Sequence, residues 1–307
     1  MALSSDGTEA LGLEANSFVD ADAVIINADL VHAYNNLPLS STSESFSRRW
    51  TSCSSISFYW SLSRRIPELK NHNIFLAGNY AESFIEIFRE HRVPCEPSFY
   101  VNVPSRADPS AAPKGKDAVI VLVPLGHLKP STPTEGQEAE NYWDELVTDV
   151  REAVISTVEQ RTGITGLRKA IAHEIANTPV TWRDKFNLDR GAILGLSHSF
   201  FNVLSFRTNV KHDTINKLYF VGASTHPGTG VPTCLAGARL TAEQVLGDLG
   251  IPIPWSNASP EPKRQKQAGT TQTMCFRAPR MLMLSCLFVI ALAFSINLSR
   301  ITVLSIG

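Results

Sequence analysis

The chain has 307 residues, 43% of them hydrophobic, and a formal net charge of −1 at pH 7. This length suggests one large domain or two, with enough apolar residues for a sizeable core. The balanced charge gives no indication of a nucleic-acid partner, which usually shows as a basic patch. The five cysteines form no Cys-x-x-Cys pair, so we expect neither a disulfide framework nor a metal site.

The first ninety residues predict a strand, a loop and a helix. A hairpin-like segment leads to Asp22, and the apolar run over residues 23–26 follows as a buried strand. Residues 35–49 are polar and serine-rich and predict a loop. Asn79 can cap a helix that ends near His91. The residues expected on its inward face are Phe84, Ile87 and Phe88.

The middle of the chain alternates strands and helices. Residues 97–103 and 118–123 predict strands, separated by a proline-rich turn over 108–113. Beyond a loop over 129–137, apolar residues at helical spacing predict a long amphipathic helix that stops at Gly163. These residues are Trp143, Leu146, Val147, Val150, Val154 and Val158. Residues 166–190 predict a second helix, followed by a loop around Thr178-Pro179.

The most informative passage runs from Leu218 to Val245. Residues 218–221 predict a buried strand, residues 222–230 a loop of small residues, and Pro232 suits the first turn of a helix. The residue before Pro232 is Val231, which unlike Ser, Thr, Asp or Asn has no side chain that could cap the helix. The first N–H groups of the helix are therefore available to a ligand, with a preference for anions. The expected buried face consists of Leu235, Ala238, Ala242, Val245 and Leu246.

The C-terminal residues change in composition. Residues 251–280 are rich in proline and basic residues and predict a flexible linker. Residues 281–300 follow, and most of this segment is apolar, with no charge before Arg300. About 20 such residues cross a bilayer core, so this segment predicts a single transmembrane helix. Basic residues before it place the folded part on the cytosolic side, with the endoplasmic reticulum as the expected membrane.

The amino-acid sequence of the glycine-containing loop resembles that of a known family. Phe220-Val-Gly-Ala-Ser-Thr-His-Pro-Gly-Thr-Gly-Val-Pro232 closely resembles the C-terminal flavin-binding signature of the phytoene desaturases, the FAD-dependent carotenoid desaturases. The similarity extends from about residue 5 to about residue 250. Its other segments are residues 22–30, 53–60, 72–77, 98–102, 104–113, 122–127, 191–198 and 206–207.

The resemblance implies a fold class. We expect a mixed α/β (α+β) chain that corresponds to the C-terminal half of a two-domain flavin amine oxidase-like fold. The Gly-x-Gly-x-x-Gly motif that opens the family's FAD domain is missing, which suggests a fragment or truncated form. The expected parts are partial FAD-domain strands (1–40), a substrate- or membrane-facing domain (41–200), a C-terminal FAD-binding strand, loop and helix (201–250), the linker (251–280) and the membrane helix (281–300).

The resemblance also implies an activity. The family introduces double bonds into a linear C40 polyene, such as phytoene, by hydride transfer to FAD. The substrate is expected to come from a lipid bilayer, and NAD is a candidate final electron acceptor. The implied FAD contacts are Gly222, Ala223, Gly228, Gly230, Val231 and Pro232. No general base is identifiable from the sequence.

Three further polar residues near this loop have more than one candidate role. Arg207 belongs to the family's Phe-Arg-Pro pattern, with Thr208 in place of proline, and either supports the cofactor or substrate or forms a structural salt bridge. His226 is expected to hold the flavin loop by hydrogen bonding. His198 is expected to be a buried, satisfied histidine rather than a base.

Two other functions remain possible from the sequence. The missing Gly-x-Gly-x-x-Gly favours a non-catalytic, membrane-anchored polyene- or lipid-binding module, and the isolated chain is then expected to bind FAD weakly. The near-intact loop over residues 222–232 favours the desaturase. A retinol saturase-like or amine oxidase-like enzyme is the third alternative, and residues 72–77 and 98–113 argue against amine oxidases.

Overall fold

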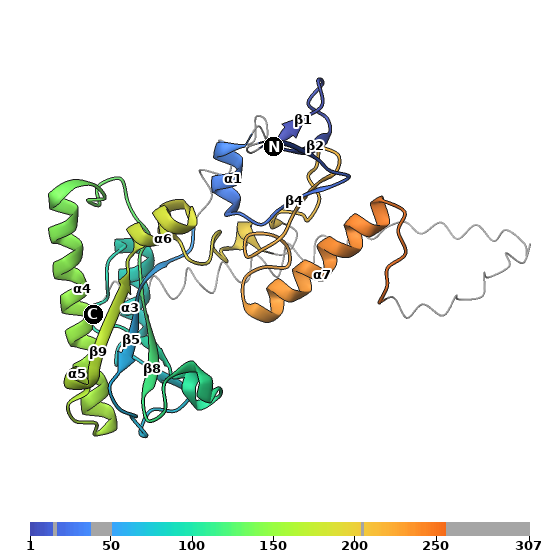
Figure 1. Cartoon of the computed structure of the whole chain (residues 1–307). Coiled ribbons are helices and arrows are strands. Elements are labelled where there is room, and N and C mark those ends of the chain that lie inside the picture. Colours follow the sequence, from blue (N-terminus) through green and yellow to red (C-terminus); the bar gives the residue numbers. More distant parts are fainter. Residues whose placement is uncertain (15–16, 38–50, 204–205, 256–307) are drawn as a thin grey trace, which may run out of the picture. The chain divides into compact units, whose positions relative to one another are not determined.

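The computed structural model describes residues 1–14, 17–37, 51–203 and 206–255. Residues 1–254 form one compact unit with mixed α/β structure (Figure 1). The remaining residues form a second unit, of which the described part contains only Trp255.

A five-stranded antiparallel sheet occupies the middle of the chain. Its strand order is β6-β7-β8-β5-β9. The central strand β8 has every second side chain buried, which is the alternation expected of a sheet with one covered face. The strands are β5 (Ser54–Leu62), β6 (His72–Phe75), β7 (Phe99–Asn102), β8 (Asp117–Leu125) and β9 (Ile171–Asn177).

Helix α4 (Gly136–Thr162) covers this sheet (Figure 1). Trp143, Val150, Val154 and Val158 are buried in the same apolar cluster as Phe58 and the inward residues of β8. Gly163 ends the helix in a left-handed conformation with φ 76°, which glycine adopts without a Cβ penalty. The sequence prediction of this long amphipathic helix is confirmed.

The helix predicted within residues 166–190 is mostly wrong. Only α5 (Leu167–Ala170) is helical before the chain enters β9, which pairs with β5 as an edge strand. The loop predicted around Thr178-Pro179 is instead the start of α6 (Pro179–Phe186), with Thr178 as N-cap. The sequence did not reveal β9 because its stability comes from pairing with a strand about a hundred residues earlier, as Phe58 opposite Ala176 illustrates.

A shorter helical segment lies between β6 and β7. Asn79 caps α3 (Tyr80–Ile85) as predicted, and a π-helix over Glu86–Glu90 continues it to His91. Ile87 is buried, but Phe84 and Phe88 are 44% and 46% exposed. The predicted inward face is therefore wrong for both phenylalanines. The π-helical turn changes the angular position of Phe88, whereas Phe84 lies before that turn, in α3. Short 3-10 turns follow at Pro104–Arg106 and Pro109–Ala111.

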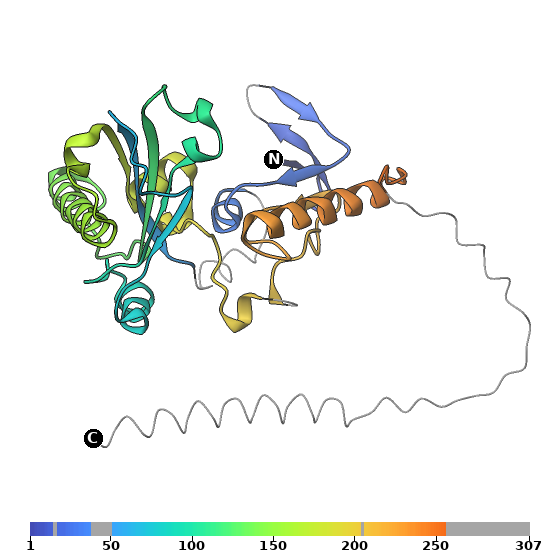
Figure 2. The same cartoon turned by 90° about the horizontal axis from the view of Figure 1, so that it is seen from below.

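The remaining described residues build a second apolar cluster from both ends of the chain. β4 (Val24–Ile26) and β10 (Leu218–Phe220) confirm the two predicted strands, and the structure pairs them in parallel. Helix α1 (Leu30–Asn36) follows β4. A three-stranded antiparallel sheet precedes β4, made of β1 (Ala2–Leu3), β2 (Ala10–Glu14) and β3 (Phe18–Asp20). Helix α7 (Val231–Asp248) follows β10 (Figure 2).

Helix α7 buries a different face from the predicted one. Leu235 is 67% exposed, whereas the buried residues are Gly237 and Thr241. Thr241 Oγ1 donates to the Phe220 carbonyl at 3.0 Å, and a Cβ on Gly237 would lie 3.3 Å from Pro227 Cδ. Close approach to the backbone selects small residues here, and hydrophobic spacing alone does not predict that.

The predictions of a transmembrane helix over residues 281–300 and of a membrane location are contradicted. Within the residues that the structure describes, no helix is long and apolar enough to span a bilayer. α4 has 27 residues but carries charged side chains along its length, and each charge at the bilayer centre costs about 2.5–3.5 kcal/mol on insertion scales. The segment 281–300 itself, like residues 256–280 of the predicted linker, lies outside the described residues.

Candidate functional site

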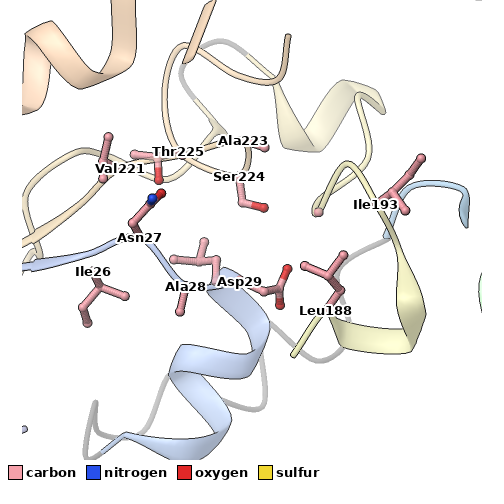
Figure 3. A pocket seen from close by; sticks show the side chains of 13 residues that line it. Ile26, Asn27, Ala28, Asp29, Leu188, Ile193, Val221, Ala223, Ser224 and Thr225 are labelled. Carbon is pink, nitrogen blue, oxygen red and sulfur yellow. The ribbon is translucent and has the colours of Figure 1, made fainter. Parts of the chain in front are cut away.

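A cavity of about 130 Å³ lies at the carboxyl ends of β4 and β10 (Figure 3). Parallel strands that end side by side open a crevice where their chains diverge, and ligands of α/β proteins bind in such crevices. The walls come from the segment after β4, the segment after β10 and the chain that returns from the five-stranded sheet. The lining residues are Ile26, Asn27, Ala28, Asp29, Leu30, Leu188, Ile193, Gly195, Val221, Gly222, Ala223, Ser224 and Thr225.

Two glycines let the three walls approach one another. Gly222 has φ 126°, and a Cβ there would lie 2.9 Å from Asn27 Oδ1. Gly195 has φ 65°, and a Cβ there would overlap Ser224 Oγ. Both positions combine a left-handed backbone with a close contact, so only glycine fits them without strain.

The polar side chains of the cavity differ in whether they already have hydrogen-bond partners within the protein. Ser224 Oγ accepts a hydrogen bond from the Leu196 amide at 3.0 Å, which fixes its orientation. Asp29 Oδ1 accepts from the His32 amide at 3.0 Å and caps α1. Asn27 is exposed, and its side-chain amide has no hydrogen-bond partner within the described ranges, so it is available to a ligand.

Asp29 also has an acidic neighbour. Burial raises the pKa of Asp29, and backbone N–H groups, His32 and Asp189 among them, oppose the rise by donating to its carboxylate. Burial also raises the pKa of Asp189, and the nearby Asp29 adds to that increase. The cavity therefore has a wall on which an uncharged carboxyl group is favoured more than at a normal surface position.

Arg207 lies behind the loop after β10, with only 2% of its surface exposed. Its Nε donates to the Thr225 carbonyl at 3.2 Å and its Nη1 to the Asn202 carbonyl at 2.7 Å, and Nη2 donates to the Ala223 carbonyl. In the part of the chain that the structure describes, no carboxylate pairs with it. The guanidinium thus organises backbone carbonyls of the loop, and the salt bridge considered from the sequence does not form among these residues.

The predicted cofactor contacts separate into two groups. Gly222 and Ala223 line the cavity, whereas Gly228, Gly230, Val231 and Pro232 lie outside its lining. Gly230 occupies the N-cap position of α7 with no capping side chain, and Val231 is 76% exposed. The first turn of α7 therefore keeps the uncapped N–H groups that the sequence indicated.

The two histidines of this region are both more exposed than a core residue. The His226 ring is exposed, and the residue holds the loop through its backbone amide, which donates to the Thr208 carbonyl at 2.8 Å. His198 is also exposed rather than buried, and a Cβ on Gly228 would lie 3.3 Å from its Nε2. Partial burial, with the nearby Arg207 as a second cause, lowers the pKa of His198.

Sequence reasoning missed the side chains that follow β4. Asn27 and Asp29 come directly after the predicted strand 23–26, and Ser224 and Thr225 lie within the predicted loop. The available signal was the position of polar residues immediately after two buried strands. Gly195 and Leu188 gave no such signal, since only the tertiary structure brings the returning chain to this crevice.

Known proteins resemble this chain over most of its length. A phytoene desaturase of Fusarium fujikuroi is 52% identical over 280 residues, covering 85% of this chain and 49% of that protein. One from Neurospora crassa is 51% identical over 253 residues, covering 80% of this chain and 42% of that protein. A zeta-carotene-forming phytoene desaturase of Myxococcus xanthus is 40% identical over 242 residues, covering 78% and 45%.

Two other comparisons add little. No family model matches the chain. The solved structure of an oxidoreductase from Methanosarcina mazei is 16% identical, with a TM-score of 0.46, and covers 79% of this chain and 47% of its own; likeness at this level supports no conclusion. The identities to curated desaturases do: the chain is a homologue of the fungal phytoene desaturases and belongs with them to one family, spanning about half the length of the relatives it matches.

Proposed function

We infer that this chain supplies part of the cofactor site and the polyene-facing part of an FAD-dependent phytoene desaturase. The observation that carries the inference is 52% identity over 280 residues to the phytoene desaturase of Fusarium fujikuroi. Because the chain spans about half of that protein, the complete activity requires residues that correspond to the other half. The proposed division assigns residues 1–40 and 201–250 to the FAD-binding part and residues 41–200 to the substrate-facing part.

The cavity fits one part of a flavin cofactor. Its volume of about 130 Å³ is below the range of about 300–1,000 Å³ typical of sites that enclose a whole ligand. Asn27, Ser224 and the backbone around Gly222 offer hydrogen-bonding groups of the kind that a hydroxylated chain or a ring amide requires. A longer cofactor would extend from this cavity across the loop toward the uncapped N-terminus of α7, where phosphate oxygens are favoured.

The chain's own contribution is positioning. FAD, when bound, supplies the acceptor for the hydride that leaves the polyene. Arg207 fixes the carbonyls of Ala223 and Thr225, and thereby the shape of the loop. Gly195 and Gly222 bring the cavity walls together. A small misplacement of a bound reactant can cost about a hundredfold in rate, so a loop held by a buried guanidinium suits this task.

A hybrid enzyme tests the activity. In the hybrid, this sequence replaces the matching half of the Fusarium fujikuroi protein, and the unmodified relative serves as the positive control. With FAD and phytoene in liposomes, the hybrid should yield products with longer conjugation and absorption at longer wavelength. A hybrid that binds FAD but leaves phytoene unchanged would contradict the substrate assignment. One that oxidises an amine or retinol instead would favour the alternatives considered from the sequence.

The cofactor position is tested in the same hybrid with Asn27→Leu. The leucine side chain would offer no hydrogen-bonding group to a cofactor in the cavity, and Asn27 has no side-chain hydrogen bond in the described residues to lose. We expect at least a tenfold weaker flavin affinity, measured by quenching of flavin fluorescence, with little change in the urea midpoint. Asn35→Leu is the control, because Asn35 is exposed and lines a different pocket. Equal flavin affinity in both variants would remove the cavity from the site.

The other expected partners rest on the resemblance alone. NAD as final electron acceptor and a lipid bilayer as the source of the polyene remain predictions, as do the contacts of Gly228, Gly230, Val231 and Pro232 with FAD. Gly230→Val in the hybrid addresses the last of these, since a branched side chain would hinder approach of the cofactor to the backbone.

A further inference from the structure

A pair of histidines lies in a second pocket, of about 240 Å³, beside the end of β8. The rings of His91 and His127 have centroids 4.2 Å apart and are tilted by 58°. His91 Nδ1 is buried and has no hydrogen-bond partner among the described residues. The backbone of His91 approaches Gly126 so closely that a Cβ there would overlap His91 Cα. The two rings are therefore held against each other by the backbone, not by a hydrogen bond between them.

His127 is hydrogen-bonded to the chain that enters the five-stranded sheet. Its Nδ1 lies 3.1 Å from the Ser52 carbonyl oxygen and 3.2 Å from Thr51 Oγ1. A carbonyl only accepts, so Nδ1 carries the hydrogen and Nε2 is the unprotonated nitrogen of the neutral ring. Thr51 and Ser52 are 6% and 5% exposed, so His127 is an internal support of this segment.

The supported segment runs beside the wall of the cavity at β4 and β10. The Ser52 amide donates to the Gly195 carbonyl at 2.8 Å, and Ser52 Oγ accepts from the Leu194 amide at 3.1 Å. The next residue after Gly195, Leu196, donates its amide to Ser224 Oγ at 3.0 Å. A continuous path of short contacts thus joins His127 to Ser224, through Ser52 and residues 194–196.

The charges around the pair oppose protonation. Burial lowers the pKa of His127 to about 4, and His91, Arg190 and Lys129 contribute to the decrease, whereas the hydrogen bond to the Ser52 carbonyl opposes it. Burial also lowers the pKa of His91, together with Lys129 and Arg190. The nearby acidic groups are already paired: Asp189 with Arg190 at 3.7 Å, and Glu86 and Glu90 with Arg92. Tyr142 also lines this pocket.

We propose that His127 is a positioning residue for the candidate cofactor cavity, and that its neutral form holds Ser224 in place through Ser52 and Leu196. An imidazolium at this site would keep the Nδ1–H that donates to the Ser52 carbonyl. It would, however, face His91, Lys129 and Arg190 without a free carboxylate among the described residues, and this repulsion would draw the ring toward water and away from Ser52. The proposal rests on the proposed function only in naming the cavity as the cofactor site. The contacts that it describes can be tested without any cofactor.

Amide hydrogen exchange of the whole chain at pH 7 tests the path. In His127→Phe the ring volume is kept and the donor is lost, so the Leu196 amide should exchange about tenfold faster, as expected for one hydrogen bond. His127→Gln keeps an N–H donor that does not titrate and should leave Leu196 near the original rate. The amides of β8 and α4 are the reference and should change less than about twofold in both variants.

Three outcomes would overturn the proposal. The first is an unchanged Leu196 rate in His127→Phe. The second is an acceleration shared equally by Leu196 and the amides of β8, which would make His127 a support of the fold as a whole. The third is an equal acceleration of Leu196 in His127→Phe and His127→Gln, since the retained donor would then be irrelevant.

A pH titration of the original chain provides a test that needs no folded phenylalanine variant. The His127 ring nitrogens and the Leu196 amide are followed by NMR as the pH is lowered from 7. Both should shift with one midpoint, and His91→Ala should raise that midpoint for both, because it removes the facing ring. A Leu196 amide that ignores the titration of His127 would overturn the proposal. Flavin affinity plays no part in either test, so a failed cofactor assignment remains distinguishable.

Discussion

Among single residues, Arg207 shows how a buried cation can be accommodated without a carboxylate. A guanidinium has five N–H donors in a fixed plane, and here they reach the carbonyls of Asn202, Ala223 and Thr225. Burial is the first cause of its lowered pKa, yet arginine stays charged in proteins. Its charge therefore polarises the loop after β10 permanently.

Arg207→Met should destabilise the chain by roughly 3 kcal/mol, because three buried carbonyls would lose a charged donor at about 1–3 kcal/mol each, with partial compensation by rearrangement. The measurement is the free energy of unfolding in urea. Arg239→Met is the matched control, since the Arg239 side chain is 64% exposed and pairs only with Glu243 on the same helix, as far as the described residues show; we expect about 0.5 kcal/mol or less there. Similar losses in both variants would contradict the structural role of Arg207.

Among the helices and strands, the return of the chain from the five-stranded sheet depends on close packing of two short helices. The 3-10 turn Asp189–Gly191 packs against α6. Gly191 has φ 65°, and a Cβ there would overlap the Pro179 carbonyl oxygen at the start of α6. The Gly191 carbonyl also accepts a hydrogen bond from Ser54 Oγ at 2.6 Å. A single glycine thus joins α6, the returning chain and β5.

Gly191→Ala should lower the stability of the fold more than the same substitution at a glycine whose added Cβ would meet no other atom. Gly115 is the matched control, because it has φ 79° and no atom within 4 Å of an added Cβ. A left-handed alanine costs about 1–2 kcal/mol at either position, and the overlap with Pro179 should add about 1–3 kcal/mol for Gly191. The midpoints of thermal unfolding measure the difference. Equal midpoints would show that α6 can move away without cost.

Across the whole molecule, histidines whose pKa values are lowered in the folded chain link stability to pH. Burial is the largest cause of the lowered pKa values of His91, His127, His198 and His212. His212 is the most informative of them, since its ring is stacked with Tyr34 and its Nδ1 accepts hydrogen bonds from the amides of Thr214 and Ile215, at 3.1 and 3.0 Å. A proton on Nδ1 would break both hydrogen bonds.

The chain should lose stability as the pH falls below about 6.5. A histidine with a lowered pKa in the folded state binds a proton more tightly when unfolded, so acid favours unfolding. The loss begins near the ordinary pKa of 6.5 and continues to the lower folded value. His212→Asn should make the free energy of unfolding fall less steeply with decreasing pH, because an asparagine carbonyl can accept hydrogen bonds from the same amides without titrating. The free energy of unfolding between pH 7.5 and 5 measures it.

The dependence of the unfolding free energy on pH is compared between the original chain and His212→Asn, and the difference isolates His212 from other titrating groups. Asp29 and Asp189 act in the opposite sense, since their raised pKa values make the protonated form more stable in the folded chain, and that contribution is lost as the pH rises. Both carboxyl groups are unchanged in His212→Asn. A variant whose stability falls with pH as steeply as that of the original chain would exclude His212 as a contributor.

Several features of this protein could be predicted from local sequence pattern. The 3.6-residue period from Trp143 to Val158, the Asn79 cap and the strands that became β4, β8 and β10 follow from spacing, side-chain chemistry and apolar runs. The wording of residues 220–232 was likewise sufficient to indicate the family. These signals are local because a few consecutive residues suffice to bury a face or satisfy a helix end.

Other features depend on distant partners and arise only in the folded chain. β9 forms where pairing with β5 overrides helical spacing, and α7 turns Gly237 and Thr241 inward because β10 and Pro227 lie too close for larger residues. The cavity likewise required Asn27, Gly195 and Ser224 to meet from three separate segments. The physical reason is common to all three: strand pairing, close backbone approach and pocket walls are interactions between residues far apart in sequence, and no local pattern encodes their partner.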